Sequence, residues 1–233
     1  MVNWKRFERL WNKEEPVQEK FEYYLFLQFV QSYFKYRQIR KPVVVEIGVK
    51  QIKQRYFYEA FLGADWYGID IVSFSCPKIC LGNSSDSSTL ERLKCLLKGR
   101  MIDLLFIDGN HDYSVVKMDW QMYSVLTAHL VAFHDINLQG KEYTGSFVGS
   151  VYQLWNELKL QGLSMVEFNC PGLIEVVDGS LIDHYLCDPG IGVVLLDRGR
   201  PEVGWKFDDK TLFELMWGRK GKFYARTQGK VYC

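Results

Sequence analysis

Short apolar runs alternate along this chain with longer segments in which apolar residues recur every three or four positions. Five of these runs have the length of a β-strand: residues 42–48, 66–70, 78–82, 102–108 and 129–135. The segment between the third and fourth runs places four leucines on one helical face. Strands that alternate with helices predict a mostly parallel sheet covered on both faces, which is the doubly wound α/β class.

Helical patterns follow the first, third, fourth and fifth apolar runs. We expect helices over residues 54–62, 87–99, 114–126 and 146–160. In the second of them, Ser88 and Glu91 have the spacing of a capping box. Two later apolar runs, 165–169 and 190–197, have no clear helix between them. This arrangement predicts an antiparallel hairpin at one edge of the sheet.

The pattern divides the chain into three parts. Residues 42–197 hold the predicted sheet, and residues 198–233 resemble a short helix followed by a basic tail. Residues 1–41 form a helical N-terminal extension with aromatic-rich patterns over 4–11 and 19–36. We expect these helices to pack against the core. A cap over the functional face, or a subunit interface that makes a homo-oligomer, are the alternatives.

Composition narrows the classes of protein that fit this pattern. With 233 residues, 48% of them hydrophobic, the chain can bury a sizeable core. The net charge of +1 gives no strong signal for nucleic acid or an anionic membrane. The apolar runs are shorter than the ~18 residues of a membrane span, and the N-terminus is too charged for a signal peptide. We therefore expect a soluble, cytoplasmic protein. Its six cysteines contain no CxxC pair, which argues against a zinc ribbon and favours reduced thiols.

Polar side chains collect where the predicted strands end. They are Glu46 and Gly48 after the first strand, Asp70 after the second, Asn83 and Ser84 after the third, Asp108 after the fourth, and His134 with Asp135 after the fifth. Parallel sheets bind ligands beyond the carboxyl ends of their strands. An acid after a strand is often only a helix cap or a turn residue. The coincidence of so many polar residues predicts a ligand-binding crevice at this edge.

Asp70 suggests a nucleoside ligand. An acid at the end of the second strand, about 20 residues beyond a glycine turn, can accept hydrogen bonds from both hydroxyls of a ribose. The loop after the first strand, residues 48–54, holds a single glycine in place of G-x-G-x-x-G. Binding of a dinucleotide such as NAD is therefore disfavoured.

Asp108 and Asp135 suggest a metal site. If the fourth and fifth strands are neighbours, about 4.8 Å apart, the two carboxylates lie side by side, and His134 or His111 can join them. Two carboxylates and an imidazole suit Mg²⁺ or Mn²⁺, with Fe²⁺ as an alternative. Adjacent residues of a strand point to opposite faces, so His134 and Asp135 both reach one ion only if the chain turns at the strand end.

Three other polar residues nearby receive structural interpretations. Asp112 is expected to cap the following helix, and Asp119 is expected to lie on a solvated helix face. His129 stands at the entrance of the fifth strand, and we do not expect it to bind the metal.

These motifs, taken in order, resemble a known family. They read VVVEIG, YGID, LGNSSDSSTLERL, DLLFIDGNHDYSVVKMDWQMY, FHDI, VYQLWNELK and GIGVVLLD. The chain is similar, over roughly residues 42–197, to the class I S-adenosylmethionine (SAM)-dependent methyltransferases of the cephalosporin-hydroxylase-like and sugar O-methyltransferase group. The most specific part is the pairing of FIDGNHDY with FHDI. The resemblance implies a Rossmann-like, seven-stranded sheet whose last strand is antiparallel.

The resemblance also implies roles for the residues at the strand ends. The resemblance places Glu46 and Gly48 beside the methionine and ribose of SAM, Asp70 on the ribose hydroxyls, and Asn83 with Ser84 beside the adenine. It makes Asp108, His134 and Asp135 the metal ligands, and Asp108 also a cofactor-binding and catalytic residue. It makes His111 the general base. Two features depart from the family pattern. The first loop lacks a second small residue, and His134 stands where relatives often have an acid.

The function implied is a SAM-dependent, metal-assisted O-methyltransferase that acts on a hydroxyl of a sugar, a glycan or another small molecule. Coordination to a metal lowers the pKa of a hydroxyl, and His111 can take its proton. The acceptor pocket would be built from loops and the N-terminal segment. A catalytically silent binding or scaffold protein, and another small-molecule enzyme such as a metal-dependent oxidase or hydroxylase, are the alternatives. Fold alone does not separate them.

Overall fold

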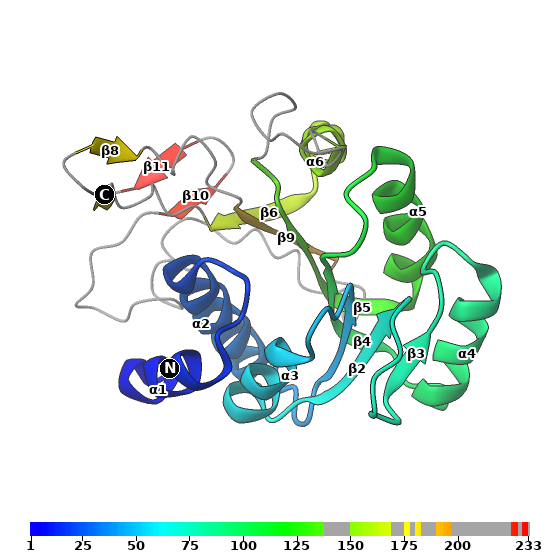
Figure 1. Cartoon of the computed structure of the whole chain (residues 1–233). Helices are drawn as coiled ribbons and strands as arrows, with labels where there is room; N and C mark the ends of the chain where they lie inside the picture. Colours follow the sequence, from blue (N-terminus) through cyan, green and yellow to red (C-terminus); the bar gives the residue numbers. More distant parts are fainter. Residues whose placement is uncertain are drawn as a thin grey trace.

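A mixed β-sheet lies between two layers of helices (Figure 1). Its strands are β1 (Val43–Ile47), β2 (Asp65–Asp70), β3 (Ile79–Leu81), β4 (Ile102–Ile107), β5 (Thr127–His134), β6 (Ser164–Phe168), β9 (Ile191–Leu195), β10 (Ala225–Thr227) and β11 (Lys230–Tyr232). In this computed structural model the spatial order is β11-β10-β6-β9-β5-β4-β1-β2-β3. Strands β7 (Glu175–Val177) and β8 (Ser180–Ile182) form a separate antiparallel pair.

The structure describes residues 1–137, 150–168 and 190–196, together with the backbone of β7, β8, β10 and β11. The helix expected within 198–233 and the start of the helix expected over 146–160 fall outside these residues. Among the described residues, no helix is long and apolar enough to cross a membrane. The three cysteines in this part of the chain, Cys76, Cys80 and Cys95, are free thiols.

The pairing of the strands confirms the predicted fold class. Strands β3, β2, β1, β4 and β5 are parallel to one another, and β9 runs antiparallel to both β5 and β6. These seven strands form the predicted sheet, including the antiparallel pairing of the last two apolar runs. That pair is not at the sheet edge, however, because β10 and β11 continue the sheet beyond β6.

The predicted helices are present over the described residues. They are α1 (Trp4–Glu14), α2 (Lys20–Tyr36), α3 (Lys53–Phe57) with a π-helical turn η1 (Tyr58–Leu62), α4 (Ser87–Leu97), α5 (Tyr113–Tyr123) with a 3₁₀ turn η2 (Ser124–Leu126), and α6 (Ser150–Leu160). The predicted capping box is wrong. The cap of α4 is Asp86, whose extended backbone precedes the helix and whose carbonyl accepts the N–H of Thr89. Ser88 therefore lies inside the first turn.

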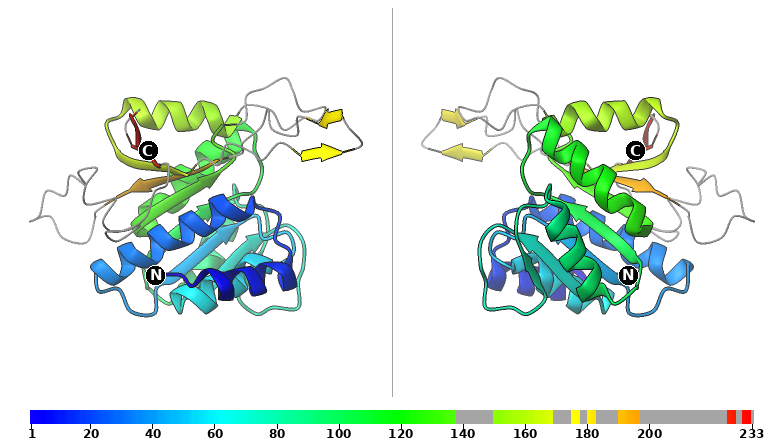
Figure 2. Two further views of the ribbon diagram at one scale, coloured as in Figure 1. Left: turned by 90° about the vertical axis from the view of Figure 1, so that its left-hand side faces the viewer. Right: turned by 90° about the vertical axis from the view of Figure 1, so that its right-hand side faces the viewer.

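Helices cover both faces of the sheet (Figure 2), and a hydrophobic layer lies between the helices and the sheet on each face. Helices α1, α2 and α3 pack on the face to which Val44 and Leu104 point. Helices α4, α5 and α6 pack on the face of Val45 and Leu105. Neighbouring strand residues thus alternate between the two cores, as the period of two in a strand requires.

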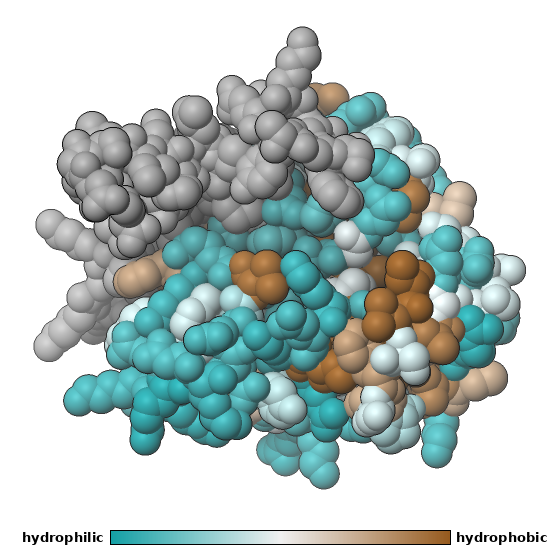
Figure 3. Space-filling model, viewed as in Figure 1, coloured by the Kyte–Doolittle hydropathy of each residue, from teal (hydrophilic) through white to brown (hydrophobic). Residues whose placement is uncertain are grey.

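The N-terminal helices pack against the sheet as predicted. Tyr23, Phe26 and Phe29 of α2 are fully buried, and the ring of Phe26 lies 5.5 Å from that of Phe106 in β4. The solvent side of α1 carries exposed basic side chains, and Figure 3 shows a hydrophilic surface over this helix. The homo-oligomer through these helices stays a prediction.

Candidate active site

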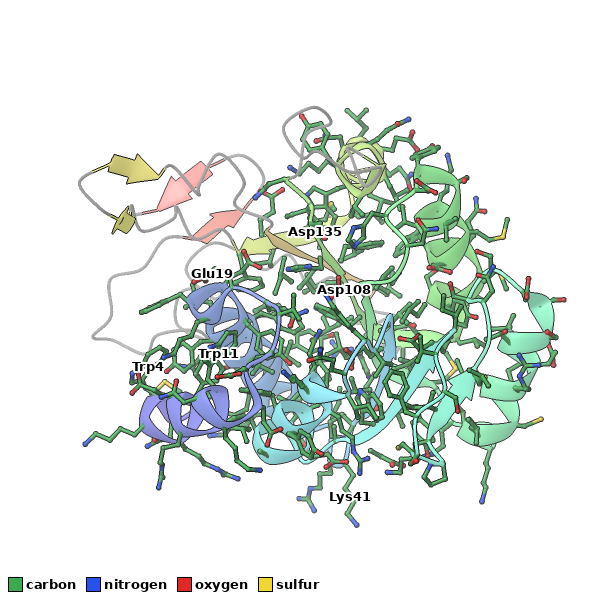
Figure 4. The ribbon with its side chains drawn as sticks, in the orientation of Figure 1. Trp4, Trp11, Glu19, Lys41, Asp108 and Asp135 are labelled. Carbon is green, nitrogen blue, oxygen red and sulfur yellow. The ribbon has the colours of Figure 1, made fainter. Side chains whose placement is uncertain are left out.

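The loops at the carboxyl ends of the parallel strands are joined into one continuous rim. The backbone N–H of Asp108 donates to the last carbonyl of β1 (2.9 Å), and the N–H of Gly48 donates to the next-to-last carbonyl of β2 (2.9 Å). Farther along, the N–H of Gly82 donates to the carbonyl of Asp70 (2.8 Å). The rim therefore brings the predicted residues to one edge. Figure 4 shows Asp108 and Asp135 at this edge and Lys41, which precedes β1, at the opposite end.

Gly48 is required by the close approach of two loops. Its φ is +85°, and a Cβ atom there would lie 2.1 Å from the carbonyl oxygen of Asp108. Only glycine avoids that collision and adopts this backbone without strain. The position of Asp108 thus depends on Gly48. The predicted contact of Gly48 with a cofactor stays a prediction.

Two acids and two histidines form a single cluster beside this rim. Nδ1 of His134 lies 3.1 Å from Oδ1 of Asp108 and 3.3 Å from Oδ1 of Asp135. Nε2 of His111 lies 3.0 Å from Oδ2 of Asp135 and 3.7 Å from Oδ1 of Asp108. The pairing of β4 with β5 brings the acids together, as predicted. Both histidines contact both acids.

The turn that the sequence argument required occurs at Asp135. Strand β5 ends at His134, and Asp135 has a φ of +59°. In this left-handed region a residue other than glycine costs roughly 1–2 kcal/mol, although aspartate tolerates it better than most. The turn lets two neighbouring side chains face the same cluster. The strain is therefore linked to the geometry of the site.

Neighbouring charges in the cluster shift the pKa values of Asp108 and of both histidines. Burial opposes ionisation of Asp108, but His134 and His111 hold the pKa of Asp108 well below its usual range. Asp108 and Asp135 raise the pKa of His111 against the effect of its partial burial. Burial disfavours the charged form of His134, yet the same two carboxylates raise the pKa of His134 well above its usual value. Positive charge on the two histidines, which these raised pKa values favour, offsets the negative charge of Asp108. A divalent cation bound here would take over that role and release protons.

The residues of the cluster fit a divalent metal ion. Asp108, His111 and Asp135 each offer one ligand atom, and these atoms lie within 4.8 Å of one another. Oxygen and imidazole donors suit Mg²⁺, Mn²⁺ or Fe²⁺. His134, the third predicted ligand, presents Nδ1 to both acids. Either histidine, or both, can complete the coordination, and the assignment of His111 as base stays a prediction.

Asp70 is held with its carboxylate at the end of β2. Its Oδ2 accepts the backbone N–H of Lys50 (2.9 Å) and its Oδ1 accepts that of Val72 (2.8 Å). Each oxygen keeps a second lone pair, so two hydroxyls of a ribose can still bind. The irregular loop after β1 is oriented by this contact. Lys50 and Gln51 are exposed, and Ile52 packs against the hydrophobic layer of α2.

Gln18 is a site residue that the sequence did not reveal. It lies just before α2, and its Nε2 donates to Oδ2 of Asp108 (2.7 Å). Its Oε1 is buried and has no hydrogen-bond partner among the described residues. A buried acceptor without a donor is costly, so a ligand that brings an N–H group would satisfy it. The ammonium group of an amino acid, such as that in SAM, fits this requirement.

Glu46 lies below the rim instead of opening onto it. It is fully buried, and its Oε2 accepts a hydrogen bond from Nε1 of Trp66 (2.8 Å). Burial raises the pKa of Glu46 well above its usual value, only partly offset by the Trp66 bond. Its predicted contact with SAM stays a prediction.

The predicted adenine residues form a hydrogen-bonded turn. Oδ1 of Asn83 accepts the N–H of Ser85 (3.1 Å), and the carbonyl of Ser84 accepts from the hydroxyl of Tyr123 (2.7 Å). Asp119, on the inner face of α5, lies behind this turn; burial raises the pKa of its carboxyl group, and the hydroxyl of Ser84 lowers it in part. The turn is thus tied to α5 through Ser84. Whether they border adenine stays a prediction.

The prediction of a solvated Asp119 is wrong. The residue is fully buried, with neither carboxylate oxygen in a hydrogen bond of good geometry among the described residues. It shares one helix face with Val116 and Tyr123, three residues before it and four after it. By contrast, Asp112 does cap α5 with an extended backbone, and His129 lies away from the cluster, 3.7 Å from Asp103.

No protein-family model matches the sequence, and no curated protein matches it either. Among solved structures, the chain is similar to MycE, a methyltransferase from the mycinamycin biosynthetic pathway, in a complex with Mg, SAH and mycinamycin VI. The identity is 16% and the TM-score 0.54, over 89% of this chain and 58% of that one. It is also similar to a Staphylococcus aureus protein provisionally assigned as a caffeoyl-CoA O-methyltransferase, with 15% identity, a TM-score of 0.53, and coverage of 84% of this chain and 92% of that one.

The chain has the class I methyltransferase fold. The Rossmann-like fold class predicted from the motifs is therefore confirmed. This chain spans only 58% of the length of MycE, and the cephalosporin-hydroxylase-like subgroup stays a prediction.

Proposed function

We propose that this protein is a SAM-dependent O-methyltransferase that uses a divalent metal ion, Mg²⁺ or Mn²⁺, to activate a hydroxyl group of its acceptor. One observation carries the proposal. The cluster of Asp108, His111, His134 and Asp135, in which the two histidines and two acids are buried or half-buried, adjoins the rim that holds Asp70. Solved structures of MycE, to which this chain is similar in fold, contain Mg and SAH. The acceptor we propose is a small molecule or glycan with a free hydroxyl.

Each residue of the site has a separate role in the proposed reaction. SAM would supply an electrophilic methyl group, and the metal would lower the pKa of the acceptor hydroxyl. Asp70 would hold the ribose of SAM, and Oε1 of Gln18 would accept from its ammonium group. Asp108, Asp135 and His134 would hold the ion, while His111 would take the proton from the acceptor. Much of the rate would come from holding the oxygen and the methyl carbon in line.

A second candidate has a specific observation in its favour. The cluster contains two histidines beside carboxylates, and two histidines with one carboxylate bind Fe²⁺ in non-haem oxygenases. A metal-dependent oxidase or hydroxylase would use this set without SAM. Binding of SAH, the demethylated product of SAM, therefore separates the two candidates.

Calorimetry with SAH tests the proposed function. The wild type should bind SAH, and Asp70→Ala should weaken binding by about 1.5–3 kcal/mol, because a charged acceptor of two hydroxyls is lost. Glu91→Gln, a charge change on the exposed side of α4, is the matched control and should bind like the wild type. Absence of SAH binding, with and without Mn²⁺, would reject the methyltransferase. Equal affinity of Asp70→Ala would reject the role of Asp70.

A further inference from the structure

Helix α2 places a fully buried acid against the metal-binding cluster. Glu22 has no exposed surface, and its Oε1 lies 3.8 Å from Nε2 of His134. Its Oε2 accepts the backbone N–H of Gly190 (3.0 Å), which comes directly before β9. One oxygen is thus anchored by the backbone while the other faces the histidine.

The anchor of Glu22 also reaches the strained turn. The carbonyl of Gly190 accepts the N–H of Ile136 (3.4 Å), the residue after Asp135. The same N-terminal segment contacts Asp108 through Gln18 (2.7 Å). Residues 18–22 therefore contact Asp108 and His134 directly, and reach the turn after Asp135 through Gly190, although all of these lie about 90 residues or more away in the sequence.

His134 has different neighbours on its two ring nitrogens. Nδ1 faces Asp108 and Asp135, where a metal would sit, and Nε2 faces Glu22. An imidazole that binds a metal through Nδ1 must carry its hydrogen on Nε2. At 3.8 Å the Glu22 carboxylate is within ion-pair range of Nε2 but beyond hydrogen-bond distance, and its charge favours that tautomer electrostatically.

We infer that Glu22 is a positioning residue whose carboxylate favours a hydrogen on Nε2 of His134, so that Nδ1 presents its lone pair to the metal between Asp108 and Asp135. The N-terminal extension then contributes a residue that prepares the site for metal binding. This inference rests on the proposed function, because it requires the cluster to hold a divalent ion.

The substitution Glu22→Gln separates this role from a purely structural one. The glutamine oxygen can still accept from Gly190, so a structural anchor would be retained. Its NH₂ group, however, would face Nε2 of His134 and donate to it. That contact places the ring hydrogen on Nδ1, which blocks coordination. The variant also removes a buried charge, so its stability should not fall.

Titration with Mn²⁺ in the presence of SAH, using the full chain, measures the effect. Glu22→Gln should weaken Mn²⁺ binding by about 10–100-fold, the usual cost of losing such a partner, while the affinity for SAH and the melting temperature stay near those of the wild type. Gln28→Met is the control. Gln28 is equally buried in α2 but bonds to Val2 and Tyr24, so Mn²⁺ affinity should not change.

Wild-type Mn²⁺ affinity in Glu22→Gln would overturn the inference, and so would a wild type that binds SAH but no Mn²⁺. If Glu22→Gln does not fold, the tautomer of His134 in the wild type tests the inference instead. Long-range ¹H–¹⁵N spectra of the four histidines with Mg²⁺ and SAH should show the Nε2–H tautomer for His134, and the Nδ1–H tautomer would refute it. The proposed function is judged separately, by SAH binding to the wild type.

Discussion

Replacing Asp119 with asparagine should stabilise the protein at neutral and alkaline pH. The carboxyl group is fully buried on the inner face of α5, and burial raises its pKa from 3.8 to about 7, with a small opposing effect of Ser84. Asparagine has nearly the same shape and carries no charge. The substitution therefore removes the cost of burying the ionised form.

The sign and size of the effect follow from the two pKa values. Below about pH 4 the group is protonated in both the folded and the unfolded chain, so it adds no pH dependence. Between pH 4 and 7 only the unfolded chain has lost the proton, and the free energy of unfolding falls by about 1.4 kcal/mol for each pH unit. Above pH 7 the penalty is constant at about 4 kcal/mol. From pH 5 to pH 8 the wild type should lose about 3 kcal/mol that Asp119→Asn keeps.

Urea denaturation of both proteins at pH 5, 6, 7 and 8 measures this difference. The control is Asp112→Asn, a change of an exposed acid at the start of the same helix, whose pH dependence should match that of the wild type. Parallel curves for the wild type and Asp119→Asn would refute the reasoning. They would show that Asp119 is ionised at an ordinary pH, through water or a ligand that satisfies its oxygens.

Two further predictions concern the cluster of Asp108, His111, His134 and Asp135. Asp135→Asn keeps a residue that tolerates the left-handed turn but removes a charged ligand. The affinity for Mn²⁺ should fall more than tenfold while SAH still binds. An unchanged Mn²⁺ affinity would exclude Asp135 as a ligand. His111→Ala should keep the SAH affinity but lower the rate of methyl transfer by about 10²–10⁴, as expected for a general base. Loss of Mn²⁺ binding in His111→Ala, with activity regained in excess Mn²⁺, would make His111 a ligand instead.

The sequence predicted those features that depend on local patterns. The strands and helices follow from the spacing of apolar residues, which is a property of short segments. The acids at the cluster followed from a rule about strand ends, combined with the correct guess that β4 and β5 are neighbours. The alternation of side chains also showed that His134 and Asp135 could face one ion only if the chain turned at the strand end. These inferences needed no knowledge of distant contacts.

The errors and omissions involve long-range packing. The burial of Asp119 depends on which face of α5 meets the sheet, although its spacing from Val116 and Tyr123 was a signal for the buried face. Gln18 and Glu22 reach partners that lie 90 and 168 residues away. No local pattern specifies such pairs, and the sequence around them reads as an ordinary helix start. Tertiary packing alone brings them to the site.

Several energetically costly features of this structure lie close to Asp108. Asp135 adopts a left-handed backbone, and Glu22 and Glu46 are carboxyl groups without exposed surface. Gln18 adds a buried acceptor that no described group satisfies. Strained backbone and buried polar groups without partners usually occur where function requires them. A protein that only bound partners through its surface would gain nothing from these buried costs, whereas an enzyme that holds a metal ion and a charged cofactor would. Their concentration around Asp108 therefore favours chemistry at this site over a silent scaffold.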